Sequence, residues 1–463
     1  MKKISKILLA ATVLSFALIS CGTEKDASGV KRSKSKDANY QGYQAEIDPA
    51  TGKIYDFGGM EVTYYDWWSN PDAPAASKQQ EDQMAFRAWM EKTYNYKCVQ
   101  KDLAGWGQNP AEVANFCITG SNEYAVFTID GRSALSGLKA NLWADLSKID
   151  NIDWSKKKWT QGVISKLKDG DSFYSFNVGN PEPRSGVFFN KRVLQENGID
   201  PDLPYDLQKD GKWTWEAFED LCKKLTKDTN NDGITDQWAM ASSNGIWAEN
   251  ILYSNGVKLI SKENGKFVNN TGTDAAMEAW DFVRRTFTTY QRPQLEGENW
   301  DYYFAAFQNG EVAFCFEDEY NCQPNGKFNS MKDDYGFVCC PMGPKGPGHV
   351  TTTHGTNMVI LPSFYDLATA KKIMKIVDFF TEDVPGYDDP EAWKEGYWAS
   401  FRDERAVNET LQYMLDYPYE SIAGYVPDLT KDEMAWNICG GADPLETYER
   451  FKDQWQALID NVN

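Results

Sequence analysis

From residue 60 to the C-terminus, short β-rich runs alternate with segments of helical periodicity. The β-rich runs lie at residues 60–67, 125–129, 186–189, 312–316 and 357–361. Thr214 caps the clearest of the intervening helices, in which apolar side chains recur every three or four residues. Strands that alternate with amphipathic helices indicate an α/β architecture with partly parallel sheets.

The length of the chain predicts two domains. Of the 463 residues, about 400 follow a polar N-terminal stretch, which is too long for one compact core. The formal net charge is −20, which argues against nucleic acid as a partner and against a polyanionic ligand. The 17 Trp, 24 Tyr and 24 Phe supply a core and could also stack on sugar rings, but composition alone does not separate these uses.

The cysteine pattern disfavours a structural zinc site, because the nine Cys contain no C-x-x-C pair and the chain has only two His. Cys222 falls on the apolar face of the helix that Thr214 caps. We therefore expect most cysteines other than Cys21 to be buried free thiols, since free Cys behaves as a small hydrophobe. The sequence has no Walker loop and no dinucleotide fingerprint, so no organic cofactor is expected.

The N-terminus predicts export and a lipid anchor. Lys2, Lys3 and Lys6 precede an apolar stretch at residues 7–19 that is too short to span a bilayer comfortably. Leu18-Ile19-Ser20-Cys21 resembles the lipobox of bacterial lipoproteins, which implies a signal peptide at residues 1–20 and lipidation of Cys21. The polar residues that follow predict a flexible tether over 21–57, with the ordered body starting near Gly58.

The segment from Asp228 to Asp236 matches the first nine positions of an EF-hand loop. Oxygen-bearing side chains stand at positions 1, 3, 5 and 9, Gly233 allows the sharp turn, and position 7 would ligate through its backbone carbonyl. The predicted ligands are Asp228, Asn230, Asp232, Ile234 and Asp236. Position 12 is Ala239 instead of Glu, so a carboxylate outside the loop must complete a structural calcium site. The alternative is an Asn/Asp/Gly-rich turn without a metal.

Four segments in a characteristic order resemble family 1 extracellular solute-binding proteins, which include the maltose-binding and other sugar-binding components of ABC importers. They are GVFFNKRVLQENGID at 186–200, KWTWEAFEDLCKKLTKD at 212–228, YYFAAFQNGEVAFCFEDEY at 302–320, and YGFVCCPMGPKGP at 335–347 followed by GTNMVILP. The resemblance runs from about Gly58 to the C-terminus. The chain departs from the family at Glu317-Asp318-Glu319-Tyr320, where an aromatic or Gly-Pro-Trp is common in sugar binders.

The resemblance implies a two-lobed periplasmic-binding-protein fold of type II, with a ligand cleft between the lobes. We expect lobe one at 58–178 plus 355–410 and lobe two at 184–345 plus 415–463, with hinge crossings near 175–185, 345–355 and 410. The implied partners are a sugar or oligosaccharide and the permease subunits of an ABC transporter. The protein would be a monomer, held by lipid on the extracytoplasmic face of the membrane, and would not bind nucleic acid.

Candidate ligand contacts come from loops at strand ends. Asp66 and Trp68 follow the first strand, where vicinal Trp67 and Trp68 cannot point the same way, and Asp130 and Arg132 follow the strand at 125–129. Carboxylates suit such sites because they accept strong hydrogen bonds from hydroxyls, although Asp130 could instead cap a helix. The candidates on the second lobe and the hinge are Trp247, Glu317, Glu319 and His354.

A glycoside hydrolase is the rival class of protein. Such an enzyme needs two carboxylates that flank a cleft, and Asp130 with Glu317 is the pair that the sequence offers. The chain has no G-x-S-x-G and no H-E-x-x-H motif. We therefore expect a binding protein and not an enzyme, with a peptide or another non-sugar solute as the alternative ligand.

Overall fold

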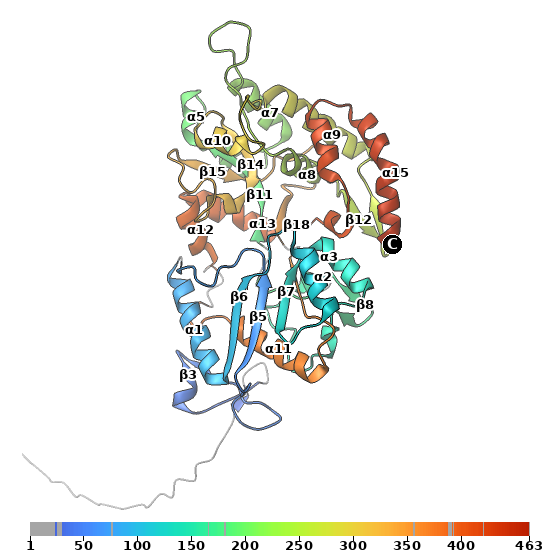
Figure 1. The fold of residues 1–463 in the computed structure, drawn as a ribbon. Coiled ribbons are helices and arrows are strands. Elements are labelled where there is room, and N and C mark those ends of the chain that lie inside the picture. Colours follow the sequence, from blue (N-terminus) through green and yellow to red (C-terminus); the bar gives the residue numbers. More distant parts are fainter. Residues whose placement is uncertain are drawn as a thin grey trace, which may run out of the picture.

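The computed structural model describes residues 24–25, 30–75, 77–164, 166–179, 182–354, 357–387, 391, 393–419 and 421–462. They form two α/β lobes, one above the other in Figure 1, so the predicted fold class is confirmed. We call the lower lobe, which holds most of the N-terminal part of the chain, lobe one, and the upper lobe lobe two.

A four-stranded sheet of order β17-β7-β5-β6 forms the centre of lobe one. Strand β5 (Met60–Asp66) lies parallel to β6 (Tyr96–Asp102) and β7 (Tyr124–Ile129), while β17 (Met358–Ile360) runs antiparallel to β7. Successive residues of a strand face opposite sides, so Tyr64 and Tyr65 enter different apolar clusters.

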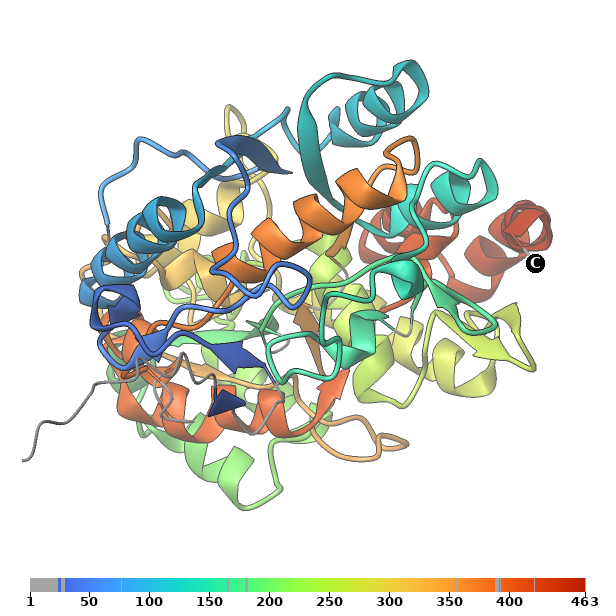
Figure 2. The same ribbon diagram turned by 90° about the horizontal axis from the view of Figure 1, so that it is seen from below.

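Helices cover both faces of this sheet. Helices α1 (Lys78–Tyr94) and α11 (Leu367–Phe380) pack on one face, and α2 (Asn109–Thr119) and α3 (Gly131–Lys139) pack on the other. The smaller elements of lobe one are η2 (Leu146–Lys148), α4 (Gln161–Ile164), β8 (Lys168–Asp169) and β9 (Ser172–Phe173). Figure 2 shows α11 in orange with the blue N-terminal segment beside it.

The N-terminal segment differs from the predicted tether, because residues 30–57 pack onto lobe one. Ala45 is fully buried, and Ala38 and Ile47 are also buried. The small elements of this segment and of the residues before it are β1 (Glu24–Lys25), β2 (Lys31–Arg32), η1 (Lys36–Ala38), β3 (Asn39–Tyr40) and β4 (Tyr43–Gln44). A few apolar residues in a polar stretch suffice to dock it, which average composition does not reveal. Cys21 and the predicted signal peptide lie outside the described residues and stay predictions.

Lobe two is built around an antiparallel sheet of order β14-β11-β15. Strand β11 (Ser185–Asn190) is buried along its whole length and lies between β14 (Phe314–Asp318) and β15 (Tyr335–Val338). A strand covered on both faces and both edges reads as a continuous apolar run, as Val187 to Phe189 does. A separate hairpin joins β12 (Ile260–Glu263) to β13 (Lys266–Asn269).

The helices of lobe two surround this sheet and the hairpin. Thr214 caps α7 as predicted, since its side chain accepts a hydrogen bond from the Ala217 N–H. The helices are α5 (Lys191–Glu196), α6 (Leu203–Lys209), α7 (Trp215–Leu225), α8 (Asn244–Ser254), α9 (Asp274–Tyr290), α10 (Tyr302–Gln308), η3 (Glu319–Cys322), α12 (Trp393–Phe401), η4 (Ala406–Leu411), α13 (Gln412–Asp416), α14 (Lys431–Cys439) and α15 (Pro444–Val462). The eight cysteines after Cys21 are free and buried, as expected.

A small sheet of order β10-β16-β18 lies where the lobes meet. Strand β16 (Thr351–His354) pairs antiparallel with β10 (Glu182–Pro183) and parallel with β18 (Pro418–Tyr419). Next along the chain, η5 (Ala423–Tyr425) contacts α3 of lobe one. A methyl group on Gly131 would lie 2.9 Å from the backbone of Gly424, so this contact requires glycine.

The third crossing differs from the predicted position near residue 410. Tyr387 still donates a hydrogen bond to Asp82 of lobe one, whereas α12 already belongs to lobe two. Phe401 packs against Phe337 of β15 with ring centroids 5.3 Å apart. The chain therefore crosses between 387 and 393, and residues 393–410 lie in lobe two. Helical periodicity locates an apolar face but does not say which of two cores receives it.

Candidate functional site

A cleft of about 1390 Å³ lies between the lobes. Lobe one contributes residues that follow β5, β6 and β7 and the C-terminal end of α11. Lobe two contributes residues from β11, β14, α8 and the segment that leads into α14. Clefts between domains are a preferred place for small-ligand sites.

The wall formed by lobe one carries two exposed indoles. Trp68 is 55% exposed and Trp106 is 57% exposed, both inside the cleft. Trp67 meets Trp68 edge to face at 5.0 Å, and both line the cleft, so the expectation that the vicinal pair could not point the same way is wrong. A flat aromatic face open to a water-filled cleft is a platform for the apolar face of a ring.

Asp130 and Arg132 line the cleft beside Trp106, as the sequence predicts. The Asp130 carboxylate caps α3 by accepting from the Arg132 N–H at 3.0 Å, and its Oδ2 lies 2.7 Å from Arg132 Nη2. The guanidinium of Arg132 lies 3.8 Å from the centroid of the Trp106 ring and donates to its carbonyl. Capping and cleft lining therefore occur together, and these contacts fix both side chains before a ligand arrives.

The wall formed by lobe two carries a similar arrangement. Arg184 lies 3.3 Å from Asp318, and its guanidinium lies 4.7 Å from the centroid of the Tyr320 ring. Tyr320 is 43% exposed and lines the cleft. Each wall thus presents an aromatic ring in contact with an Arg–Asp pair.

A second polar cluster on lobe two surrounds Glu249. Its carboxylate accepts from Lys431 Nζ at 2.5 Å and from Ser421 Oγ at 2.9 Å, and Tyr253 is a further donor. Burial opposes ionisation, but the charge of Lys431 and these hydrogen bonds outweigh it and lower the pKa of Glu249. The cluster presents a fixed, charged group to the cleft.

Four exposed carboxylates complete the lining, and together they make the cleft acidic. Asp130, Asp318 and Glu249 are each matched by a nearby cation, as described above. In the part of the chain that the structure describes, none of the four has an ion pair with Lys or Arg within 4.0 Å. They are Glu182, Asp383, Asp428 and Asp432.

Several predicted contacts do not line the cleft. Asp66 is fully buried and accepts hydrogen bonds from the N–H groups of Trp68 and Ser69 and from Gln100, so it orders the loop after β5. Trp247 is 1% exposed and lies in the core of lobe two, where its indole donates to Thr286. Trp247 lies on the buried face of α8, and the sequence of this segment does not specify which face of the helix points to the core.

Glu317 and Glu319 are also buried, at 2% and 1% exposure, behind the wall that Asp318 and Tyr320 form. The alternation of a strand and a short turn sends every second residue of Glu317-Asp318-Glu319-Tyr320 inward. The pair Asp130 and Glu317 therefore does not flank the cleft. The backbone of His354 lies in β16, opposite Glu182, but its side chain lies outside the described part.

The sequence analysis missed Trp106, Arg184, Glu249 and Lys431. Trp106 stands in the Gly-rich stretch after β6, and an isolated Trp next to glycines was a signal that could have identified it. The other three come from three different segments, and only the fold brings them together.

The loop from Asp228 to Asp236 is largely exposed, and its carboxylates accept hydrogen bonds from within the loop. Asp228 accepts from the N–H groups of Asn231 and Gly233, and Asp236 accepts from Thr229. Among the described residues, no three acidic, His or Cys side chains are gathered to hold a metal ion. The turn has the predicted backbone, with Gly233 at φ +88°, and calcium binding at this loop stays a prediction.

Comparison with known proteins bears on the identity of the chain. No curated protein matches it. Among solved structures it resembles the GacH receptor of Streptomyces glaucescens, crystallised unliganded and with acarbose (15% identity, TM-score 0.60, covering 87% of this chain and 99% of that one). It also resembles UgpB from Mycobacterium tuberculosis in complex with glycerophosphocholine (14%, 0.60, 87% and 99%) and the maltose/maltodextrin-binding domain MalE from Bdellovibrio bacteriovorus bound to maltotriose (12%, 0.58, 87% and 99%).

These likenesses establish the two-lobed binding-protein fold. A search of the described helices finds none long and apolar enough to cross a membrane. The family model for bacterial extracellular solute-binding proteins matches residues 66–384, which is more than half of the chain. The chain therefore belongs to the family of bacterial extracellular solute-binding proteins.

Proposed function

We propose that this protein captures a sugar or oligosaccharide in the cleft and delivers it to the permease of an ABC transporter. The observation that carries the proposal is the pairing, on both walls, of an exposed aromatic ring with an Arg–Asp pair. Trp106 with Arg132 and Asp130 faces the cleft from lobe one, and Tyr320 with Arg184 and Asp318 faces it from lobe two.

This arrangement matches the chemistry of a sugar. The aromatic faces can cover the C–H groups of a pyranose ring, and the guanidinium and carboxylate groups can donate to and accept from hydroxyls. Ligand contacts on both lobes would favour hinge closure, because only the closed form makes both sets at once.

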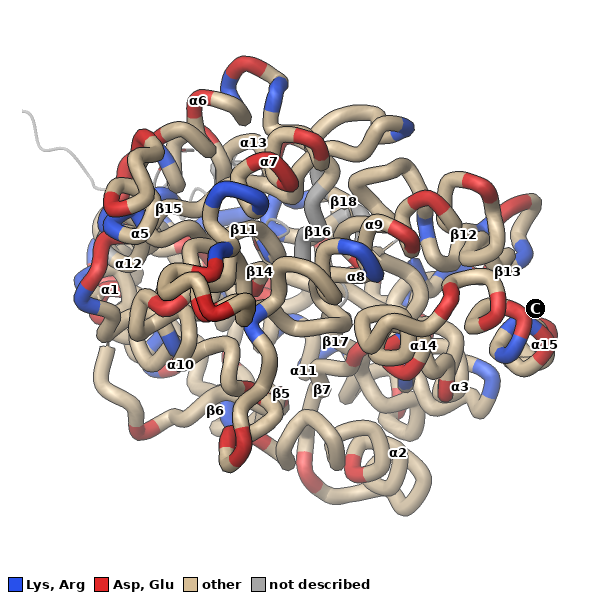
Figure 3. Tube along the Cα trace, turned by 90° about the horizontal axis from the view of Figure 1, so that it is seen from above, with Lys and Arg blue, Asp and Glu red and all other residues tan. Residues whose placement is uncertain are grey.

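The acidic lining further supports an uncharged sugar over an anionic solute. The exposed carboxylates of Asp383, Asp428 and Asp432 would repel a phosphate or uronate. In the view from above in Figure 3, acidic and basic residues are interspersed along the chain.

A peptide or other non-sugar solute is the second candidate, since UgpB, which has the same fold, was crystallised with glycerophosphocholine. Catalysis has less support, because Glu317, the proposed partner of Asp130, is buried behind the wall. We further propose that the mature protein is a monomer tethered through lipid on Cys21 at the extracytoplasmic face of the membrane.

Calorimetry against neutral oligosaccharides, a uronate oligosaccharide and short peptides tests the proposal. A saturating ligand at 100 times its Kd should add about 2.7 kcal/mol of stability. We expect a neutral saccharide to bind unchanged and Trp106→Ala to weaken it by about 1–3 kcal/mol. Trp300→Ala, which removes a 77% exposed indole outside the cleft, is the matched control. Tighter binding of the uronate or a peptide, or cleavage of the saccharide, would overturn the proposal.

A further inference from the structure

The docked N-terminal segment makes specific contacts with lobe one. The ring of Tyr43 meets Phe86 of α1 edge to face at 5.2 Å, and the hydroxyl of Tyr94 accepts a hydrogen bond from the Glu46 N–H at 2.9 Å. These contacts place the Glu46 side chain, which is 2% exposed, beneath α11.

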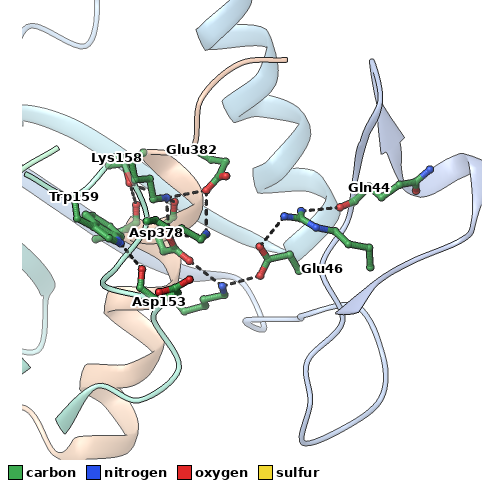
Figure 4. A network of polar contacts seen from close by, with 12 residues as sticks. Gln44, Glu46, Asp153, Lys158, Trp159, Asp378 and Glu382 are labelled. Carbon is green, nitrogen blue, oxygen red and sulfur yellow. Dashed lines mark hydrogen bonds and ion pairs between the residues drawn. The ribbon is translucent and has the colours of Figure 1, made fainter. Parts of the chain in front are cut away.

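Glu46 opens a continuous series of buried ion pairs (Figure 4). Its Oε2 lies 2.7 Å from Lys375 Nζ, and Lys375 Nζ lies 2.8 Å from Oδ2 of Asp378. Oδ1 of Asp378 lies 2.7 Å from Lys158 Nζ. These side chains are at most 6% exposed, so water does not screen the charges.

The series ends at the cleft. Lys158 Nζ lies 2.8 Å from Oε2 of Glu382 and also donates to the backbone carbonyl of Asp378 at 2.6 Å. Glu382 lines the cleft together with its neighbours Phe380, Thr381 and Asp383. Lys158 therefore fixes the C-terminal turn of α11 and the segment after it, which together form part of the wall of lobe one.

The network is nearly neutral and leaves no member unpaired. Its three carboxylates are Glu46, Asp378 and Glu382, and its four cations are Arg32, Lys156, Lys158 and Lys375. Without the Glu46 charge, Lys375 has Asp378 as its one remaining carboxylate, and Asp378 is then shared more closely with Lys375 at the expense of Lys158. Lys158 is then less firmly positioned by Asp378, so it holds Glu382 less firmly in place.

We propose that Glu46 is a positioning residue for the ligand cleft, which it reaches through Lys375, Asp378 and Lys158. The N-terminal segment is then a working part of the ligand-binding lobe as well as a connection to the anchor. This role rests on the proposed function, because it concerns the wall of the proposed sugar site.

The experiment compares full-length wild type with Glu46→Gln in two measurements. Without ligand, hydrogen–deuterium exchange should rise in peptides that cover 380–387, at and beyond the C-terminal end of α11. With maltotriose and the other neutral oligosaccharides as probes, the Kd of whichever binds should rise about fivefold or more, within the range of coupling between networked residues. Glu219→Gln is the matched control. It removes an ion pair in which Glu219 Oε1 lies 3.0 Å from Arg285 Nε, and neither residue lines the cleft, so it should change neither measurement.

Arg32→Gln is the milder variant in case Glu46→Gln does not fold, because Arg32 lies 3.6 Å from Glu46 at the outer end of the network. Arg32→Gln should raise hydrogen–deuterium exchange in the same peptides by a smaller amount. Unchanged exchange at 380–387 in both variants overturns the coupling, and increased exchange with an unchanged Kd overturns the positioning role. If no saccharide binds the wild type, the proposed function fails and the positioning role with it, while the exchange measurement still decides the coupling.

Discussion

Lobe one and lobe two each bury carboxylates next to the cleft, but the two lobes treat them in opposite ways. Asp378 of lobe one and Glu319 of lobe two are both 1% exposed. Asp378 has three lysines within 3.5 Å, whereas the nearest cation to Glu319 is Arg184 at 3.9 Å, and Oε2 of Glu319 has no hydrogen-bond partner in the described structure.

The protonation of the two groups differs accordingly. Burial would raise the pKa of Asp378, but the charges of Lys158, Lys375 and Lys156 outweigh burial and hold the pKa well below its usual range. Burial raises the pKa of Glu319 well above the ordinary value, and Arg184 compensates only in part. At equal burial, the ion-pair partners therefore favour the charged carboxylate in lobe one, whereas burial favours the neutral acid in lobe two.

The largest expected effect separates these two residues by stability. Asp378→Asn leaves the buried Lys158 and Lys375 and the half-buried Lys156 with too few counter-charges, and should lower the free energy of unfolding by about 3–5 kcal/mol. Glu319→Gln replaces a carboxyl whose ionisation is opposed by burial with a neutral amide, and should change the free energy of unfolding by less than about 1 kcal/mol. Urea unfolding followed by tryptophan fluorescence measures both. Similar losses in the two variants would show that pairing does not distinguish the lobes.

An intermediate effect is a pH dependence from Glu317. Burial first, and the charge of Asp318 second, raise the pKa of Glu317 from 4.5 to about 8. Between these values the folded protein holds a proton that the unfolded chain has released, so stability falls as the pH rises. The contribution is complete below pH 4.5 and is lost as the pH passes 8.

Glu317→Gln should therefore flatten the decline of Tm between pH 5 and 8, as measured by calorimetry across that range. Asp378 contributes no slope there, because its lowered pKa gives a stabilisation that is lost only under strong acid. If the Tm changed between pH 5 and 8 by the same amount in the wild type and in Glu317→Gln, a raised pKa of Glu317 would be contradicted.

The smallest effect concerns exposed carboxylates, in the loop from Asp228 to Asp236. If calcium binds there, it must replace hydrogen bonds that the side chains already make within the loop. EDTA should then lower the wild-type Tm slightly and leave Asp232→Ala unaffected, because metal binding is linked to folding. Scanning calorimetry with added calcium or EDTA measures this. An equal response in the two proteins would leave a turn without a metal.

The sequence predicted secondary structure well where pattern and capping agree. Strand β7 and helix α7 match the predicted elements because alternation and the Thr214 cap act locally. The lobe boundary near 390 was not predictable from periodicity, because α12 could bury its aromatic face in either lobe. The docking of residues 30–57 depends on contacts with α1 and α11, which lie far along the chain.

The candidate site followed the same division. Trp68, Asp130 and Arg132 follow strand ends directly, and the strand order places them in the cleft. The prediction that Trp247 and Glu317 line the cleft was wrong, because a shift of one residue in helix rotation or strand register moves a side chain from the cleft to the core. Lys431 could not be found from sequence, because it meets Glu249 only through packing of α14 on α8.

The sheet at the hinge has a mechanical consequence. Strands β10 and β16 carry two of the three crossings; hydrogen bonds join them to each other and join β16 to β18. Neither strand can bend alone without breaking backbone hydrogen bonds, which resist disruption where water cannot replace them. The sheet therefore couples the backbones of these two crossings. A bend at one of these crossings is therefore passed on to the other through the backbone hydrogen bonds between β10 and β16.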